Sequence, residues 1–169
     1  GPYLSSLYGA SEDGAVYVWD YDIRSGRFTP VADLDEAVSL MYSVATDGEI
    51  IAGANNDGKV YIWSAADFSL QTVLARPAGP VLSVSLDDSY IYAAAADGNL
   101  YLWNRDTFSP AAAFSAGTGI IWSAAADRSY FYGGSSSPAA AVWSKTSFTL
   151  QTALTDPAGP IGSMASDDR

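Results

Sequence analysis

The sequence predicts an all-β protein made of four copies of one four-stranded antiparallel unit. Residues of three kinds recur at a constant spacing, and short apolar segments alternate with turn residues along the whole chain. Hydrophobic residues make up 49% of the chain and charged residues only 16%, which excludes a disordered protein. We therefore expect a single folded domain over residues 1–169.

Three sets of residues define the repeat. The phenylalanines and the serines each recur every 40 residues, and the tryptophans follow at 44, 40 and 40. The four extra residues lie in the first Trp-to-Phe connection, where they predict a loop insertion. We expect the aromatic sets to form the core and the serines to be structural. The sets are Trp19, Trp63, Trp103 and Trp143; Phe28, Phe68, Phe108 and Phe148; and Ser43, Ser83, Ser123 and Ser163.

The third copy shows how each unit divides into strands. Four β-rich segments are predicted at residues 80–86, 90–95, 99–103 and 109–114. The Asp97-Gly98 pair between the second and third segments is a strong hairpin signal, because glycine tolerates the positive φ of a tight turn. No stretch keeps a helical period over about ten residues, so helix should be almost absent. The same turn recurs at Asp13-Gly14 and Asp57-Gly58, whereas Ser137-Pro138 replaces it in the fourth copy and predicts a looser hairpin.

The third strand of each unit is apolar on both faces, as residues 60–63 illustrate. Radial stacking of sheets covers both faces of every sheet, so the pattern favours a β-propeller in which each unit is a blade. Residues 93–95 and 133–134 are small and should leave room for aromatic side chains of the neighbouring blade. Three side chains at one position of the first strand are also expected to pack between blades: Tyr42, Leu82 and Trp122.

The aromatic strands carry a resemblance to a known family. An Asp-Gly turn precedes an aromatic strand ending in tryptophan in the segments DGAVYVW, DGKVYIW and DGNLYLW. By this pattern the whole chain resembles the WD-repeat β-propellers, although only Trp19-Asp20 carries the namesake dipeptide and the family's Gly-His signature is absent. The quinoprotein-type propeller repeat is a second resemblance within the same architecture. The resemblance to WD repeats implies a protein-binding scaffold.

The two ends of the sequence do not coincide with the ends of a unit. Residues 6–12 match the second strand of a blade with no first strand before them, and residues 160–166 match a first strand. Pairing these segments within one chain would close a four-bladed ring. Pairing them between two chains would close an eight-bladed ring with twofold symmetry. We favour this homodimer, because WD-like blades usually form rings of about seven or eight; an excerpt of a longer chain is the remaining alternative.

Charge and composition restrict the partners. The net charge of −11, with only eight basic residues, argues against nucleic acid and anionic membranes as partners. The excess of aspartate resembles proteins of salt-loving organisms, with an ordinary acidic protein as the alternative. Without cysteine or histidine, and without an Asp-x-Asp-x-Asp-Gly loop, we expect no metal site and no cofactor. The compartment stays open, with a cytoplasmic location as the default.

Acidic residues at the predicted turns give a candidate binding face for a basic protein or peptide. The alternative is that they serve only as turn residues. We expect no catalytic residues, and we keep two alternatives to the scaffold: a half-propeller whose only activity is ring closure, and a carboxylate-based hydrolase or lyase, for which Asp87-Asp88 offers paired carboxylates. The six residues of the candidate face are Asp13, Asp35, Glu36, Asp57, Asp97 and Asp156.

Overall fold

The computed structural model describes residues 4–117, 119–137, 139–155 and 157–167. Within these ranges the chain forms β-strands and no helix, so the prediction of an all-β fold is confirmed. It follows that no described segment is a helix that could cross a membrane. The looser hairpin predicted at Ser137-Pro138 includes Pro138, which lies outside the described residues.

The strands form four antiparallel sheets, one for each repeat, and we call these sheets blades 1 to 4. Blade 1 has three strands and the others have four, each in sequence order. Blade 1 contains β1 (Leu4–Ala10), β2 (Val16–Asp22) and β3 (Arg27–Leu34), and blade 2 contains β4 (Met41–Thr46), β5 (Ile50–Asn55), β6 (Lys59–Ser64) and β7 (Leu70–Ala75). Blade 3 contains β8 (Val81–Leu86), β9 (Tyr90–Ala95), β10 (Asn99–Asn104) and β11 (Pro110–Ser115), and blade 4 contains β12 (Ile121–Ala126), β13 (Tyr130–Ser135), β14 (Ala140–Ser144) and β15 (Leu150–Leu154).

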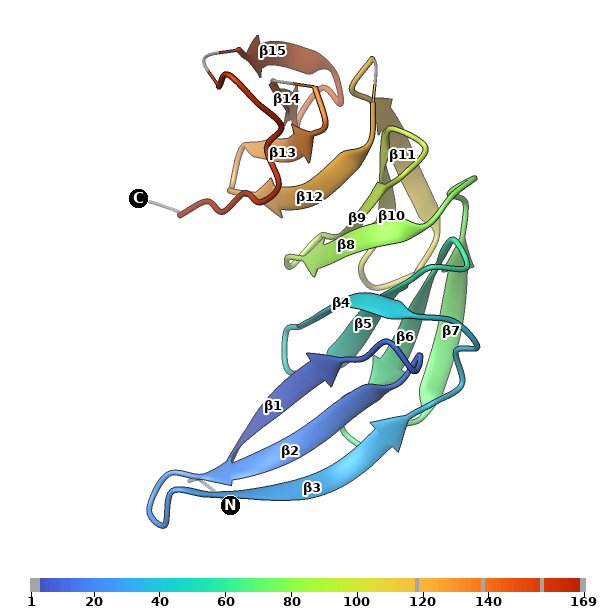
Figure 1. Cartoon of the computed structure of the whole chain (residues 1–169), viewed down its shortest axis with the longest axis vertical. Helices are drawn as coiled ribbons and strands as arrows, with labels where there is room; N and C mark the ends of the chain where they lie inside the picture. The colour runs from blue at the N-terminus through green and yellow to red at the C-terminus, as the bar shows by residue number, and fades with distance from the viewer. Residues whose placement is uncertain (1–3, 118, 138, 156, 168–169) are drawn as a thin grey trace.

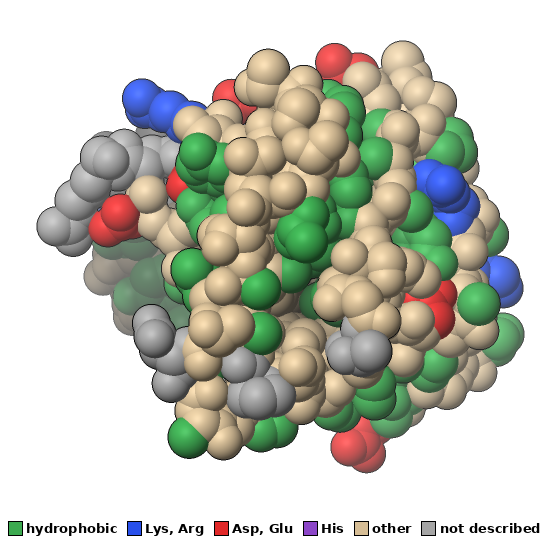
Figure 2. All heavy atoms as spheres, turned by 90° about the horizontal axis from the view of Figure 1, so that it is seen from above, with side chains coloured by type: hydrophobic (Ala, Val, Ile, Leu, Met, Phe, Trp, Pro, Cys, Tyr) green, Lys and Arg blue, Asp and Glu red, His purple; other side chains and the backbone are tan. Residues whose placement is uncertain are grey.

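The blades follow one another along an open arc (Figure 1). The first strands of blades 2 to 4, which are β4, β8 and β12, contact one another along the inner side of the arc. Blade 1 and blade 4 lie apart at its two ends, so the chain does not close a four-bladed ring on itself. Seen from above, the surface shows hydrophobic and uncharged polar side chains over its middle, with charged side chains towards the rim (Figure 2).

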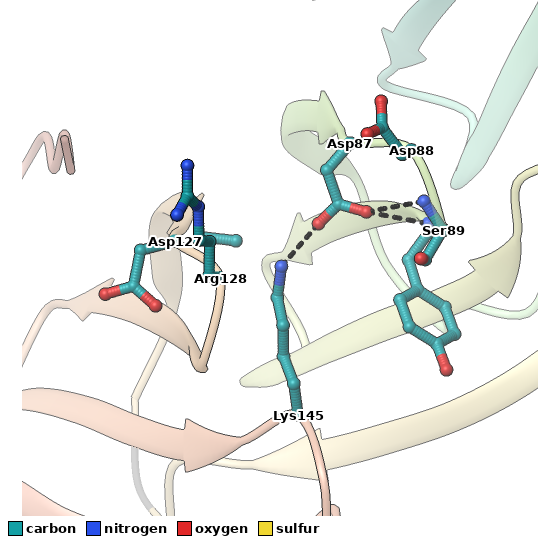
Figure 3. A pocket seen from close by; sticks show the side chains of 8 residues that line it. Asp87, Asp88, Ser89, Asp127, Arg128 and Lys145 are labelled. Atoms are coloured by element: carbon teal, nitrogen blue, oxygen red, sulfur yellow. Dashed lines mark hydrogen bonds and ion pairs between the residues drawn. The ribbon is translucent and has the colours of Figure 1, made fainter. Parts of the chain in front are cut away.

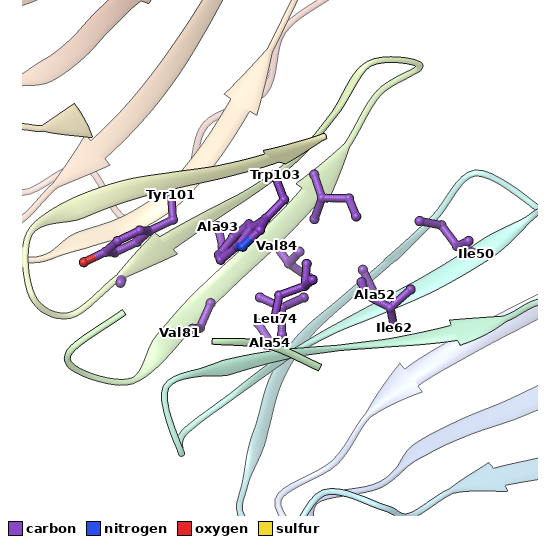
Figure 4. Close-up of a cluster of buried hydrophobic side chains, with 13 residues drawn as sticks. Ile50, Ala52, Ala54, Ile62, Leu74, Val81, Val84, Ala93, Tyr101 and Trp103 are labelled. Carbon is purple, nitrogen blue, oxygen red and sulfur yellow. The ribbon is translucent and has the colours of Figure 1, made fainter. Parts of the chain in front are cut away.

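The hydrophobic core lies between the blades, where the predicted radial stacking places it. Between blades 2 and 3, Trp103 packs with Val60, Ile62 and Leu74 in one buried cluster (Figure 4). The other two interfaces repeat this arrangement. Trp63 lies in a cluster with Val16, Val18 and Leu34, and Trp143 lies in a cluster with Leu100, Leu102 and Phe114.

Small residues opposite each tryptophan make room for it, but within the same blade. A Cβ atom added to Gly133 would lie 3.0 Å from Cζ3 of Trp143, and one added to Gly53 would lie 2.9 Å from Cζ3 of Trp63. The expectation that these small residues accommodate aromatic side chains of the neighbouring blade is therefore corrected for Gly133, whereas Ala94 does lie in one buried cluster with Phe131 and Trp143 of the next blade. The indole lies flat across its own sheet, and its outer surface then meets the preceding blade.

The phenylalanines do not form one structural set. Phe68, Phe108 and Phe148 lie in tight turns with positive φ between 54° and 62°, and the N–H of each donates to the carbonyl oxygen four residues earlier. Phe148 is partly exposed, and its ring lies against Tyr90 and Phe114 of the preceding blade. Phe28 is also exposed rather than in the core. The four extra residues lengthen the β2–β3 hairpin instead of forming a loop, and Phe28 stacks on Tyr21 across that hairpin with ring centroids 4.6 Å apart.

Replacement of a buried tryptophan tests this core. The change Trp103→Ala should lower the free energy of unfolding by about 3 to 5 kcal/mol, because it removes a large side chain and leaves a cavity between two blades. Trp122→Ala is the matched control, since Trp122 is 40% exposed and Trp103 only 1%, and it should cost clearly less than Trp103→Ala. Urea unfolding of both variants measures the difference. A loss below about 1 kcal/mol for Trp103→Ala would contradict its place in the core.

Candidate functional site

One face of the arc carries the turns between the second and third strands and the connections between blades, and we call it the turn face. The turn of each blade lies beside the connection that follows that blade. A Cβ atom at Gly14 would lie 2.8 Å from the carbonyl oxygen of Ser39, and one at Gly98 would lie 2.6 Å from that of Gly119. Asp97 also accepts a hydrogen bond from the N–H of Ala78 at 2.8 Å. The predicted acidic positions at these turns and connections therefore share one face.

The aspartates of the Asp-Gly turns are engaged in a repeated local motif. Asp13, Asp57 and Asp97 each accept a hydrogen bond from the hydroxyl of a tyrosine four residues later, at 2.7, 2.9 and 2.7 Å. Each also accepts one from the backbone N–H two residues later, at 3.0, 3.1 and 3.1 Å. These bonds explain the spacing between the aspartate and the tyrosine in the repeat, and they support the alternative in which the aspartates act as turn residues.

In the pair of Asp97 and Tyr101 these contacts lower the pKa of the carboxyl and raise that of the phenol. Burial opposes ionisation of Asp97, but hydrogen bonds from Ala78, Tyr101 and Asn99 hold the pKa of its carboxyl below the usual value. Burial and the hydrogen bond to Asp57 raise the pKa of Tyr61 to about 12. The carboxylate of Asp97 therefore stays charged and the phenol of Tyr61 stays neutral at ordinary pH.

Of the other three predicted acidic residues, Asp35 and Glu36 lie in the connection between blades 1 and 2. Asp35 and Glu36 are exposed, and Glu36 accepts a hydrogen bond from Nε1 of Trp63 at 2.7 Å. Asp156 lies outside the described residues. Among the residues described, no three acidic side chains converge to form a group that could hold a metal ion. The acidic residues thus lie on the turn face separately, each with its own local surroundings.

An apolar hollow of about 430 Å³ opens beside the turn face, lined by Tyr42, Leu82, Trp122, Ser136 and Pro160 among others. The expectation that the first three pack between blades is wrong. A β-bulge in the pairing of the first and second strands occurs at each of these positions. The extra residue of a bulge is re-aimed away from the regular ladder, so these side chains point into the hollow instead. The 40-residue spacing identified the position, but the bulge has no clear signal in the sequence.

The opposite face carries ion pairs between adjacent blades, which sequence reasoning missed. Arg105 of blade 3 contacts Asp47 of blade 2 at 2.6 Å and Glu49 at 2.7 Å. Lys145 of blade 4 contacts Asp87 of blade 3 at 2.6 Å. The basic residues are 40 positions apart and so are the two aspartates, so the repeat spacing was the available signal.

The pair formed by Lys145 and Asp87 borders a polar hollow of about 570 Å³ (Figure 3). Asp87 also accepts hydrogen bonds from the N–H groups of Ser89 and Tyr90. Burial opposes ionisation of Asp127 in the same hollow, but bonds from Tyr132, Ser129 and Tyr130 hold the pKa of its carboxyl below the usual value. A general acid needs a raised pKa, so Asp127 is poorly suited to that role in the hydrolase alternative.

The two ends of the arc have unusual strand arrangements. Among the described residues, β1 is the edge strand on the inner side of blade 1. The sequence predicts a strand at residues 160–166, but these residues do not form one in the structure. They are nevertheless held against blade 4, where the N–H of Ile161 donates to the carbonyl of Ser135 at 2.9 Å and the hydroxyl of Ser166 donates to the carbonyl of Ala126 at 2.6 Å.

This C-terminal segment takes the position that the first strand of a further blade would occupy. The bond from Ile161 to Ser135 repeats the bond from Met41 to Ser11, which joins the first strand of blade 2 to blade 1. Residues 164–166 also line the same inner hollow as residues 45–46 and 85–86 of the inner strands β4 and β8. The segment lacks strand structure because no sheet partner lies beside it.

The tyrosine and aspartate pairs give a pH-dependent prediction. The pKa of Tyr61 is about 12 in the folded chain and 10.0 for free tyrosine. The contribution of its neutral phenol to the free energy of unfolding is therefore complete below pH 10 and is lost as the pH rises towards 12. Tyr61→Phe should cost about 1 to 2 kcal/mol at neutral pH and make the alkaline loss of stability shallower. Urea unfolding between pH 7 and 11 measures both effects. Parallel pH profiles for the two proteins would refute this assignment.

Two comparisons with known proteins agree with the fold. The family model described as "WD domain, G-beta repeat" matches residues 68–104. The "Protein LST8 homolog" of Drosophila melanogaster is 31% identical over 67 residues, which are 40% of this chain and 21% of that protein. The match thus spans about a fifth of the relative's length. Together with the four repeated blades, these similarities support a WD-repeat-like β-propeller architecture.

Proposed function

We propose that the chain is a non-catalytic interaction scaffold that assembles with a second copy of itself by strand exchange. In the proposed dimer, residues 160–166 of each chain pair with residues 6–12 of the sister chain and complete its first blade. Two chains then form one ring of eight blades with twofold symmetry. The observation that carries this proposal is the match between an incomplete blade at one end of the chain and a positioned, unpaired segment at the other.

The complete blades predict the register of this pairing. In blades 2 to 4 the last residue of the first strand lies opposite the second residue of the second strand, as for Thr46 and Ile51 or Leu86 and Ile91. Shifting this pattern along the repeat places Ser166 opposite Leu7 of the sister chain and Met164 opposite its Gly9. The pairing would cover the open edge of β1, and uncovered edges are a known cause of non-specific association.

A buried hydroxyl supports the same arrangement. Among the residues that the structure describes, Ser123 Oγ is fully buried without a hydrogen-bond partner. At the equivalent position, Ser43 Oγ accepts a hydrogen bond from the N–H of Val84 on the inner strand of the next blade, at 3.3 Å. The corresponding donor for Ser123 is the N–H of Met164. Strand formation by residues 160–166 would aim this group at Ser123 and satisfy the buried oxygen.

The turn face is the proposed surface for other partners. It combines the exposed carboxylates of Asp35 and Glu36 with the apolar hollow that contains Tyr42 and Trp122. A basic protein or peptide with an apolar side chain would be complementary to both features. A pull-down that returns only the chain itself would contradict this part of the proposal and leave ring closure as the sole activity.

The mass of the assembly tests the strand exchange. Light scattering should give about 35 kDa, twice the 17.7 kDa of one chain. Deletion of residues 160–169 should give the monomer, because it removes the exchanged strand, whereas deletion of 168–169 alone should leave the dimer. Circular dichroism checks that the shortened chains keep their β-structure. A wild-type chain that remains monomeric at tens of micromolar would refute the proposed dimer.

A disulfide tests the register and separates the two kinds of ring. The chain contains no cysteine, so the double variant Leu7→Cys with Ser166→Cys introduces the only thiols. Directly opposite residues in an antiparallel pair are close enough for cross-linking. Oxidation should produce a covalent dimer on a non-reducing gel, and Leu7→Cys with Met164→Cys should cross-link less. A cross-linked monomer would instead indicate a four-bladed ring.

A further inference from the structure

We infer that the sister chains meet through a complete inter-blade interface and not through the exchanged strand alone. This inference rests on the proposed dimer and specifies its contacts. The outer face of blade 1, which we call the head face, carries Leu7, Trp19 and the stacked pair of Tyr21 and Phe28. The outer face of blade 4, which we call the tail face, carries Tyr130 and Leu154. In the dimer, each head face packs on the tail face of the other chain.

Exposure at repeat-equivalent positions identifies the head face. Leu7 lies opposite Trp19 in blade 1, as Ile51, Ile91 and Phe131 lie opposite the tryptophans of the other blades. Leu7 is 52% exposed, whereas each of these three equivalents is 0% exposed. The chemistry of the position is unchanged, and only the neighbouring blade is missing. Leu7 is therefore a core residue without its partner.

The tail face shows the same contrast. Leu154 is 46% exposed, but its equivalents Leu34, Leu74 and Phe114 are 2%, 4% and 7% exposed. Tyr130 is 38% exposed, and its equivalent Ile50 in blade 2 is 7% exposed. These two residues lie at positions that the following blade covers in the other interfaces. In the described structure no blade covers these positions of blade 4.

The interface between blades 3 and 4 shows which side chains should meet. The ring of Phe114 lies 5.5 Å from Trp143 and 6.1 Å from Phe131, measured between centroids. Tyr90 lies 5.8 Å from Phe131. Leu154 is the equivalent of Phe114, and Trp19 and Leu7 are the equivalents of Trp143 and Phe131. The same contacts between sister chains would therefore place Leu154 against Trp19 and Leu7 of the other chain. In the same way, Tyr130 would lie against that Leu7.

A second copy of this chain is the occupant that these faces select. The head face has the kinds of residue with which blades 2 to 4 contact the preceding blade. The tail face has the kinds of residue with which blades 1 to 3 contact the following blade. The proposed interface therefore continues the one already formed three times within the chain. The insertion in blade 1 supports this assignment, because Tyr21 lies two residues beyond Trp19 on the same side of β2 and extends the head face with Phe28.

Charge substitutions on one strand test the inference. Leu154→Asp would place an unpaired carboxylate in the interface, and it should weaken dimerisation by at least about 100-fold. Leu150→Asp is the matched control, since Leu150 lies on the same strand β15 and its equivalent Leu70 is exposed within a complete interface. It should leave the dissociation constant within about threefold of wild type. Sedimentation equilibrium measures the constants, and circular dichroism verifies folding.

A mixing experiment tests which faces meet. Leu7→Lys alone and Leu154→Asp alone should each be impaired, but their equimolar mixture should recover dimers. In the mixed dimer one interface joins the new lysine to the new aspartate, and the other joins the native residues. Absence of recovery, or equal constants for Leu154→Asp and Leu150→Asp, would overturn the inference while a wild-type dimer still supports strand exchange. A monomeric wild-type chain would instead refute the dimer itself.

Discussion

The packing of the tryptophans of blades 2 to 4 against the preceding blade is the contact on which the rest of the structure depends. Trp63, Trp103 and Trp143 are almost fully buried, and each lies across its own sheet with its outer surface on hydrophobic residues of the neighbour. A single four-stranded sheet could not bury both of its apolar faces. Stability is therefore shared between blades, as in other repeat proteins where each unit contacts its neighbours.

Much of the fold could be predicted, because local turn chemistry and the 40-residue period agree. The Asp-Gly pairs located the hairpins, and the predicted segments 80–86 and 90–95 correspond to β8 and β9 within a residue. Features set by departures from regular pairing could not be predicted. The bulges direct the side chains of Tyr42 and Trp122 into a hollow, and the longer hairpin exposes Phe28. Both features follow from strand register, which cannot be read from composition and residue spacing.

The candidate surfaces were harder to predict than the fold. The sequence placed Asp13, Asp57 and Asp97 on one face, but their bonds to tyrosine hydroxyls depend on side-chain directions within the turn. The ion pairs of Arg105 and Lys145 join residues from different blades, so they require the arrangement of the arc before they can be recognised. Apolar spacing determined the architecture, whereas polar contacts depend on distances of a few ångströms.

The anchoring of the C-terminal segment affects how readily two chains would associate. Ile161 and Ser166 fasten both ends of this segment to blade 4 before any sister chain arrives. Much of the entropy lost in ordering the segment therefore belongs to the folding of each chain rather than to the encounter between chains. Preorganisation of this kind strengthens association without adding contacts. In the proposed dimer it would also let two chains separate on dilution and rejoin without either of them unfolding.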